Sequence, residues 1–339
     1  MRKFFLTALL TASLLLTGCG EQKKPEGLRL ATDEENAVYS AGADMAADPN
    51  QDESAEAASA DGTTGPVSET IQEPETSAAA PSASSHTAEE YRAAGVDELN
   101  SAPILMYHRI YDMTNDETEY TGGNVDVDGY NRTCEAFEAD LEMYYEMGYR
   151  MIRLTDYIDG YIDTEFGYSP LILTFDDGIL DVVVEGFEDD GTPIFDPTCA
   201  IGILEKMKKK YPDYHVTATF FVNGGLFENG EDDKAVMKWM VNNGYDIGNH
   251  TWDHALLGTC DADEIEYQVG SIYKLLDEII PGQYVDIVAL PFGSPESMDD
   301  DEPQYNKIFS GTYEGFDYSS KASLLCGWTR SYSPFMNKF

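Results

Sequence analysis

The chain has 339 residues, and 63 acidic against 21 basic residues give it a formal net charge of −42. A surface this acidic repels nucleic acids and anionic lipid headgroups, so we expect no nucleic-acid partner. High acidity is also compatible with a simple role in solubility.

The N-terminal residues predict export. Arg2 and Lys3 precede an apolar run over residues 4–16, which is too short to cross a bilayer. Leu16-Thr17-Gly18-Cys19 resembles the lipobox of bacterial lipoproteins. We therefore predict a signal peptide over residues 1–18, lipidation of Cys19 and an extracytoplasmic location on the bacterial cell membrane. A noncleaved apolar helix would leave the same topology.

Residues 19–100 are rich in Ala, Ser, Glu, Asp, Thr and Pro and nearly lack aromatic residues. Such a segment cannot bury enough apolar surface to offset the entropy lost on folding. We predict a disordered acidic linker, which would reach roughly 50 Å as a flexible chain.

Residues 101–339 read as one α/β domain, large enough for a barrel of parallel strands. Strand-like apolar runs occur at 104–107, 151–154, 171–175, 218–222, 245–248 and 285–290. Helical spacing of apolar residues occurs at 137–148, 201–207, 236–240 and 265–279. This alternation predicts parallel βα units.

Two adjacent aspartates, Asp176 and Asp177, follow the apolar run at 171–175. A buried parallel strand that stops at two charges is typical of a strand that delivers its carboxyl end to a site. The plain alternative is that Asp-Asp-Gly forms a turn.

His250 and His254 are two of only five histidines in the chain. Histidines four residues apart share one face of a helix or helical turn, which lets both bind one metal ion. One carboxylate and two imidazoles leave positions open for water and substrate, as in a catalytic centre. The other aspartate is then free to act as a base, which predicts a hydrolase. Unrelated surface histidines are the alternative.

Three segments resemble the first three motifs of the polysaccharide deacetylase family, the NodB-homology enzymes similar to carbohydrate esterase family 4. They are Thr174-Phe175-Asp176-Asp177-Gly178, His250-Thr251-Trp252-Asp253-His254 and Leu290-Pro291-Phe292-Gly293. The resemblance covers about residues 101–339. It implies a distorted (β/α)7 barrel and metal-dependent removal of acetyl groups from N-acetylated sugars.

The resemblance also implies roles for individual residues. Asp176 is the implied catalytic base, and Asp177, His250 and His254 are the implied ligands of one divalent metal ion. We expect Zn²⁺, although this ligand set also suits Fe²⁺, Co²⁺ or Ni²⁺. A backbone N–H near Phe292 is the implied oxyanion donor.

Trp252 lies between the two histidines in the sequence. It either flanks the site or only packs against the domain.

The chain departs from the family pattern at two places. Many members have an arginine that holds the base aspartate, and Ala289 stands at that position here. Members also usually end with a Leu-x-His motif that supplies the catalytic acid, but no histidine follows His254.

The missing acid has a candidate near the other end of the domain. The segment from Pro103 to Ile110 is a short apolar run that stops at His108. It resembles the opening strand of the circularly permuted branch of the family, which includes poly-N-acetylglucosamine deacetylases. That resemblance implies His108 as the general acid. The alternative is a structural histidine at a strand end. Arg109 is a candidate replacement for the absent arginine.

Four further cysteines, Cys134, Cys199, Cys260 and Cys326, show no Cys-x-x-Cys spacing, so a thiolate metal site is not expected. Export permits disulfides, but we expect reduced thiols that are buried as small hydrophobes. Long segments at 111–130 and 181–197 are expected to rise beside the metal and shape a substrate groove.

The leading hypothesis is an N-deacetylase acting on an acetylated polysaccharide or oligosaccharide, attached to the membrane only through its lipid anchor and monomeric. One alternative is a non-catalytic surface glycan-binding lipoprotein on the same fold, favoured by Ala289. Another is an O-acetyl carbohydrate esterase, since amide and ester hydrolysis need the same metal and base. Peptidoglycan, poly-N-acetylglucosamine and chitin oligomers all remain open as substrates.

Overall fold

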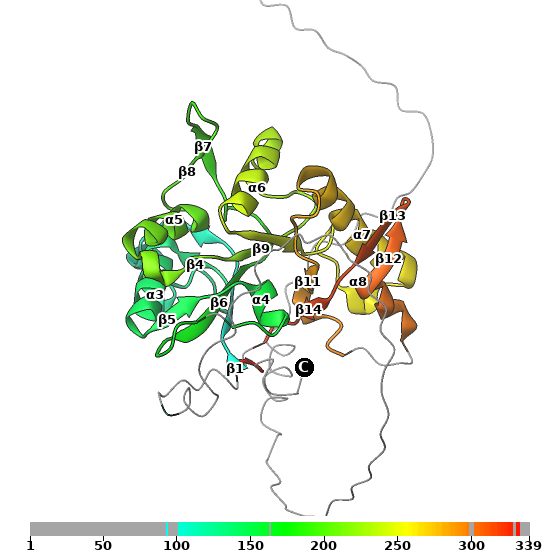
Figure 1. Ribbon diagram of the computed structural model, residues 1–339, viewed down its shortest axis with the longest axis horizontal. Helices are drawn as coiled ribbons and strands as arrows, with labels where there is room; N and C mark the ends of the chain where they lie inside the picture. The colour runs from blue at the N-terminus through cyan, green and yellow to red at the C-terminus, as the bar shows by residue number, and fades with distance from the viewer. Residues whose placement is uncertain (1–92, 94–100, 163, 298–301, 328–329, 333–339) are drawn as a thin grey trace, which may run out of the picture. The chain divides into compact units, whose positions relative to one another are not determined.

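The computed structural model describes residue 93 and residues 101–162, 164–297, 302–327 and 330–332 (Figure 1). The predicted signal peptide, Cys19 and nearly all of the predicted linker lie outside the described residues. Within the described part of the chain, no helix combines the length and apolar character needed to cross a membrane.

A curled parallel sheet of seven strands forms the centre of the domain (Figure 1). Its strand order is β14-β11-β10-β9-β6-β2, with β5 paired to β6, and every pairing is parallel. The strands are β2 (Ile104–Tyr107), β5 (Tyr149–Met151), β6 (Ser169–Phe175), β9 (Thr219–Val222), β10 (Asp246–Asn249), β11 (Ile287–Ala289) and β14 (Ala322–Leu324). The domain is therefore mixed α/β with an open, half-barrel sheet, consistent with the NodB-type barrel that was predicted.

Helices pack against both sides of this sheet, most of them on its outer face (Figure 1). They are α3 (Cys134–Glu146), α4 (Leu154–Ile158), α5 (Ala200–Lys210), α6 (Asp233–Asn242), α7 (Ala262–Ile279) and α8 (Asn306–Phe309). The two longest begin at side-chain caps: Thr133 accepts the N–H of Ala136, and Asp261 accepts two N–H groups at the start of α7. The sequence therefore fixes where both helices begin.

Short helices and two-stranded ribbons complete the described structure. The ribbons are β1 (Ser101–Ala102) with β15 (Ser331–Tyr332), β3 (Ile110–Tyr111) with β4 (Arg132–Thr133), β7 (Val184–Phe187) with β8 (Pro193–Phe195), and β12 (Ser310–Tyr313) with β13 (Phe316–Ser319). The 3₁₀ helices are η2 (Asn115–Glu117), η3 (Thr121–Gly123), η4 (Pro212–Tyr214), η5 (Gly230–Asp232), η6 (Leu257–Thr259), η7 (Pro291–Gly293) and η8 (Pro303–Tyr305). The hairpin β7–β8 lies within the long segment at 181–197.

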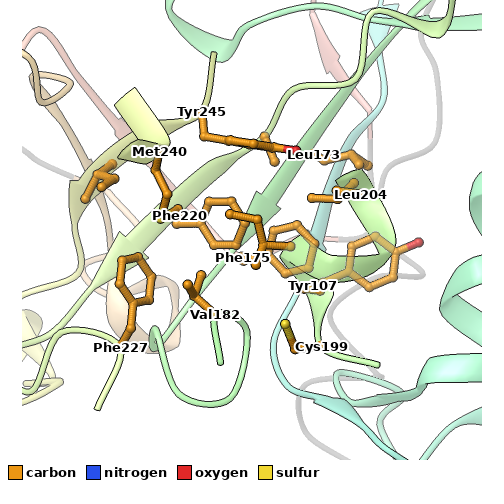
Figure 2. Close-up of a cluster of buried hydrophobic side chains, with 14 of the residues drawn as sticks. Tyr107, Leu173, Phe175, Val182, Cys199, Leu204, Phe220, Phe227, Met240 and Tyr245 are labelled. Atoms are coloured by element: carbon orange, nitrogen blue, oxygen red, sulfur yellow. The ribbon is translucent and has the colours of Figure 1, made fainter. Parts of the chain in front are cut away.

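Successive side chains of each strand point to opposite faces of the sheet, so apolar residues pack into a hydrophobic core on each face. On the outer face, Tyr107, Phe175 and Phe220 come from neighbouring strands, and their rings stack in sequence at 5.7 and 4.8 Å (Figure 2). The residue after Phe175, Asp176, therefore points to the inner face of the sheet.

The inner face has its own apolar core. It includes Ile172 of β6, Phe221 of β9, Ile287 of β11 and Tyr157 of α4, all buried. Gly248 makes room for this core, because a Cβ atom there would lie 2.6 Å from the ring of Phe221. Apolar side chains thus fill the half-barrel near the amino-terminal ends of its strands, and the polar site residues lie at the carboxyl ends.

Helix α4 is fixed to the sheet by an ion pair. Arg153, its N-cap residue, donates to both carboxylate oxygens of Asp246 at the start of β10. The Asp246 side chain is 3% exposed and that of Arg153 is 49% exposed. We expect Arg153→Ala to destabilise the fold by roughly 2–3 kcal/mol, below the range for fully buried pairs, because it leaves a buried carboxylate unpaired.

Urea denaturation would measure this change in the free energy of unfolding. The matched control is Lys274→Ala, which removes an exposed pair with Glu314 and should cost less than about 1 kcal/mol. Equal stabilities for the two variants would contradict the role given to Arg153.

Candidate metal centre

The carboxyl ends of the parallel strands bring the predicted site residues to one edge of the sheet. His108 follows β2, Asp176 and Asp177 follow β6, and His250 follows β10. Among the described residues, Asp177, His250 and His254 form a group of potential metal ligands whose donor atoms all lie within 4.8 Å of one another.

The separations within this group suit a single metal ion. Asp177 Oδ1 lies 3.5 Å from His250 Nε2 and 3.4 Å from His254 Nε2. Ligands bound about 2.0–2.1 Å from a tetrahedral Zn²⁺ ion lie roughly 3.3–3.4 Å apart. The three side chains therefore fit a divalent cation with little rearrangement.

A backbone hydrogen bond sets the tautomer of His250. Its Nδ1 lies 2.9 Å from the carbonyl oxygen of Ala289, which can only accept a proton, so Nδ1 carries the hydrogen. The buried Nε2 then faces Asp177 and has no hydrogen-bond partner within the described structure. An orphaned, buried imidazole nitrogen with its second nitrogen held by a carbonyl is typical of a metal ligand.

The loop that carries both histidines differs from the prediction. Residues 250–256 form no helix, so the expectation that His250 and His254 share one face of a helical turn is wrong. Instead, Thr251 and His254 adopt left-handed backbone conformations, with φ of 62° and 54°. These two turns bring His254 back beside the end of β10.

The electrostatics of the group favour metal binding at neutral pH. Burial opposes ionisation of Asp177, but the imidazoles of His250, His108 and His254 outweigh it and lower the pKa of Asp177 to about 2. Burial and the neighbouring His250 lower the pKa of His254 to about 4. Both groups are thus in their metal-binding protonation states near pH 7.

The pKa of His250 shifts in the opposite direction to those of Asp177 and His254. Burial lowers its pKa, but the charges of Asp176 and Asp177 and the bond to Ala289 dominate, so the pKa is raised above the ordinary value. A proton on His250 therefore competes with metal near neutral pH. We expect affinity for Zn²⁺ to rise as pH increases above the ordinary pKa of histidine, 6.5, with release of about one proton when binding occurs below the raised pKa.

Isothermal titration calorimetry in buffers of different ionisation enthalpy measures the number of protons released on Zn²⁺ binding. Asp177 and His254 titrate below the ordinary pKa of histidine, so they do not add to the count. Zn²⁺ binding without proton release at pH 6 would contradict the protonation state given to His250.

Asp176 precedes Asp177 in the sequence and points to the inner face of the half-barrel, beside the three proposed metal ligands. It is buried, and its Oδ1 has no partner among the residues that the structure describes. Burial raises its pKa, while the imidazoles of His250 and His108 oppose that effect. A carboxylate that is held close to, but outside, a ligand group is well placed to act as a base.

Ala289 leaves space beside this carboxylate. Asp176 and Ala289 both line a pocket of about 460 Å³ along the inner face between β2 and β14. The guanidinium of Arg109 influences the pKa of a different carboxylate, Asp181. The suggestion that Arg109 replaces the absent arginine stays a prediction.

Asp181 is a site-related residue that the sequence reasoning missed. It is fully buried, and neither carboxylate oxygen has a partner in the described structure. Burial and the nearby charges of Asp177 and Asp176 raise its pKa well above the ordinary value, and Arg109 opposes them. The one signal in the sequence is an acidic residue four positions after the aspartate pair.

His108 reaches the site from the adjacent strand. Its backbone N–H donates to the carbonyl oxygen of Tyr130 at 3.1 Å, and the two rings lie 5.2 Å apart. Its Nδ1 is buried without a partner in the described residues. His108 also lowers the pKa values of Asp176, Asp177 and His254, which places it within electrostatic range of these three residues.

Tyr130, at the end of the long segment 111–130, lies beside His108, while a substrate groove formed by this segment stays a prediction. Arg132 organises the segment by donating to Asp140, to the side-chain oxygen of Asn124 and to the carbonyl oxygen of Gly122. The hairpin β7–β8 rises from the same strand as the aspartate pair (Figure 1).

Phe292 and Trp252 have different environments. Phe292 is 60% exposed, has φ of 58°, and places its ring 4.6 Å from that of His254. Its ring therefore forms an exposed apolar surface next to the proposed ligands. Trp252 packs over Gly224, where a Cβ atom would come within 2.8 Å of the indole, and lies near Tyr267.

The four cysteines of the domain are free thiols. Cys199 is buried in the outer core, and Cys134 and Cys260 are partly buried. Cys326 is exposed at the end of β14, so the expectation of a buried thiol is wrong for this residue.

Comparison with known proteins supports the interpretation of the site. Residues 165–302, which include both aspartates and both histidines, match the polysaccharide deacetylase family model. This part of the chain is thus similar to polysaccharide deacetylases. His108 lies outside the matched residues.

Two similar relatives are a peptidoglycan-N-acetylglucosamine deacetylase of Bacillus cereus and a chitooligosaccharide deacetylase of Sinorhizobium fredii. The first is 33% identical over 106 residues, which are 31% of this chain and 34% of the relative. The second is 28% identical over 107 residues, which are 32% of this chain and 45% of the relative. The matched segments thus span less than half the length of either relative.

A solved structure with a similar domain is the Streptococcus pyogenes deacetylase PplD in complex with acetate. It is 22% identical and has a TM-score of 0.43. The comparison covers 66% of this chain and 92% of that protein.

Proposed function

We propose that this protein is a metal-dependent hydrolase that removes N-acetyl groups from a cell-surface or extracellular polysaccharide. The observation that carries the proposal is the convergence of Asp177, His250 and His254 beside a carboxylate, Asp176, that lies outside their group. The names of the relatives, which act on peptidoglycan and chitooligosaccharide, support a glycan substrate.

Asp177, His250 and His254 would hold the divalent cation, with Zn²⁺ as the leading candidate and Fe²⁺, Co²⁺ or Ni²⁺ compatible with the same ligands. When bound, such a cation lowers the pKa of water towards ~7 and polarises a carbonyl oxygen. Asp176 takes the proton from the water that attacks the acetyl carbon. The backbone N–H near Phe292 is the proposed donor to the oxygen that becomes negatively charged.

His108 is the proposed general acid. It gives a proton to the sugar nitrogen as the carbon–nitrogen bond breaks, so acetate and a free amine are the products. The position of β2 beside β6 supports this role, because it brings His108 to the same edge as Asp176. The same arrangement supports a circularly permuted barrel, in which the strand that carries the acid comes first in the chain.

We also propose that the domain works outside the cytoplasm as a monomer, attached to the membrane by a lipid on Cys19 and an extended linker. The signal-like residues 1–18 and the composition of residues 19–100 support this part of the proposal.

Mass spectrometry of defined oligosaccharides after incubation with the Zn²⁺-loaded protein tests the activity. N-acetylated chitin and peptidoglycan fragments are expected to lose acetyl groups, whereas acetylated xylan tests the O-acetyl esterase alternative. Loss of acetyl groups from xylan alone would replace the proposed amide substrate with an ester.

Ala289, which stands where many family members have an arginine, favours a non-catalytic glycan-binding protein as the second candidate. That candidate predicts glycan binding with no release of acetate from any substrate.

A further inference from the structure

The loop that carries the two histidines is anchored to helix α7 by a glutamine. Gln268 lies in the middle of α7, and its side chain is buried, with 2% exposure. Buried amides are retained where their hydrogen-bonding groups have partners, so its contacts indicate what it holds in place.

Gln268 holds two successive residues of the loop. Its backbone carbonyl accepts the N–H of Trp252 at 2.9 Å. Its side-chain Oε1 accepts the N–H of Asp253 at 2.9 Å, and its Nε2 donates to the carboxylate of Asp253 at 3.1 Å. Nε2 also donates to Glu264 at 3.0 Å, one turn earlier in α7, which fixes the orientation of the amide.

Other residues fix the first part of the loop. Asn223 donates to the carbonyl oxygens of His250 and Thr251, at 2.6 and 2.8 Å. Asn249 accepts the N–H of Thr251 and donates to the carbonyl oxygen of Val269. Gln268 is thus the side chain from α7 that holds the second part of the loop, directly before His254.

The backbone of this loop needs such support. Thr251 and His254 have left-handed conformations that β-branched and bulky residues rarely adopt. Strained conformations of this kind persist where surrounding contacts over-determine them. Without the bonds to Gln268, the segment next to His254 can relax, and the distance between its Nε2 and Asp177 Oδ1 is no longer fixed.

We propose that Gln268 is a positioning residue that sets the placement of His254 for metal binding. This inference rests on the proposed metal centre. Gln268 touches neither the three proposed ligands nor Asp176 through any hydrogen bond in the described structure, so it acts through the backbone of residues 252–253.

The test is a Co²⁺ titration of the metal-free protein at 25 °C, followed by visible absorption. Gln268→Leu is expected to raise the Kd for Co²⁺ by about 10–100-fold and to change the absorption spectrum of the bound ion. The matched control is Gln283→Leu, which replaces an exposed glutamine beyond the end of α7 and should leave both unchanged. Circular dichroism before titration checks that each variant is folded.

A pair of variants provides a second test if Gln268→Leu fails to fold. Gln268→Glu keeps an acceptor for the N–H of Asp253 but places like charges beside Asp253 and Glu264, so Co²⁺ affinity should fall. Adding Asp253→Asn to this variant restores a hydrogen bond between the two side chains, in which the amide of residue 253 donates and the carboxylate of residue 268 accepts. The double variant should therefore recover most of the lost Co²⁺ affinity. A purely structural role for Gln268 would lower thermal stability without this pattern of loss and recovery.

Two outcomes separate this inference from the proposal on which it rests. Wild-type protein that binds Co²⁺, together with a folded Gln268→Leu variant of equal affinity and spectrum, overturns the inference alone. Wild-type protein that binds no Co²⁺ overturns the proposed metal centre and the inference with it.

Discussion

Asp176→Asn is expected to lower kcat by about 10³–10⁴-fold, near the upper limit for the loss of a general base, while metal affinity stays close to that of the wild type. Asparagine has nearly the same shape but cannot take a proton from water. Asp176 lies outside the ligand group, so the replacement leaves the donor atoms of Asp177, His250 and His254 in place. Acetate release from an acetylated oligosaccharide and a parallel Zn²⁺ titration measure the two effects.

The control for this variant is Asp286→Asn, at the opposite end of β11 from the site. It should leave kcat unchanged. An Asp176→Asn protein with wild-type turnover would end the assignment of Asp176 as the base.

His108→Ala is expected to reduce kcat by about 10²–10⁴-fold with metal binding retained. The reason is that the leaving amine no longer receives a proton from the residue at the end of β2. Turnover on an oligosaccharide substrate across a range of pH values measures the loss.

His215→Asn is the matched control for His108→Ala. His215 precedes β9 at the other end of the strands and has a left-handed backbone that asparagine tolerates. It should have wild-type activity. Unchanged turnover in His108→Ala itself would mean that the acid lies elsewhere.

Much of the sheet could be predicted because buried parallel strands appear as continuous apolar runs. The run at 171–175 became β6, and the run at 218–222 became β9, with shifts of one or two residues at their ends. Helix α7 was equally predictable, since its apolar residues recur at helical spacing over 18 residues.

Short and partly buried elements could not be predicted in this way. Strand β14 has three half-buried residues, Ala-Ser-Leu, which carry no apolar run. The run at 151–154 was predicted as a strand, but β5 ends at Met151 and α4 begins at Leu154. Position in the fold, not local composition, decides the structure of such segments.

The candidate site was predictable to the extent that chemistry follows residue type. Asp177, His250 and His254 do converge, but through left-handed turns at Thr251 and His254, and not through a helix. Sequence spacing cannot show such turns in residues other than glycine or asparagine. The role of Gln268 was hidden for a related reason: a polar residue in a helix gives no sign of which loop it holds.

The pairing of β1 with β15 has a consequence for how a tethered enzyme would face its surroundings. Ser101 and Ala102 enter the sheet where β2 begins, and His108 stands where β2 ends. These points are separated by roughly 20 Å of extended chain. A chain segment attached at residue 101 would therefore join the domain near the start of β2, opposite to the end that carries the proposed metal centre.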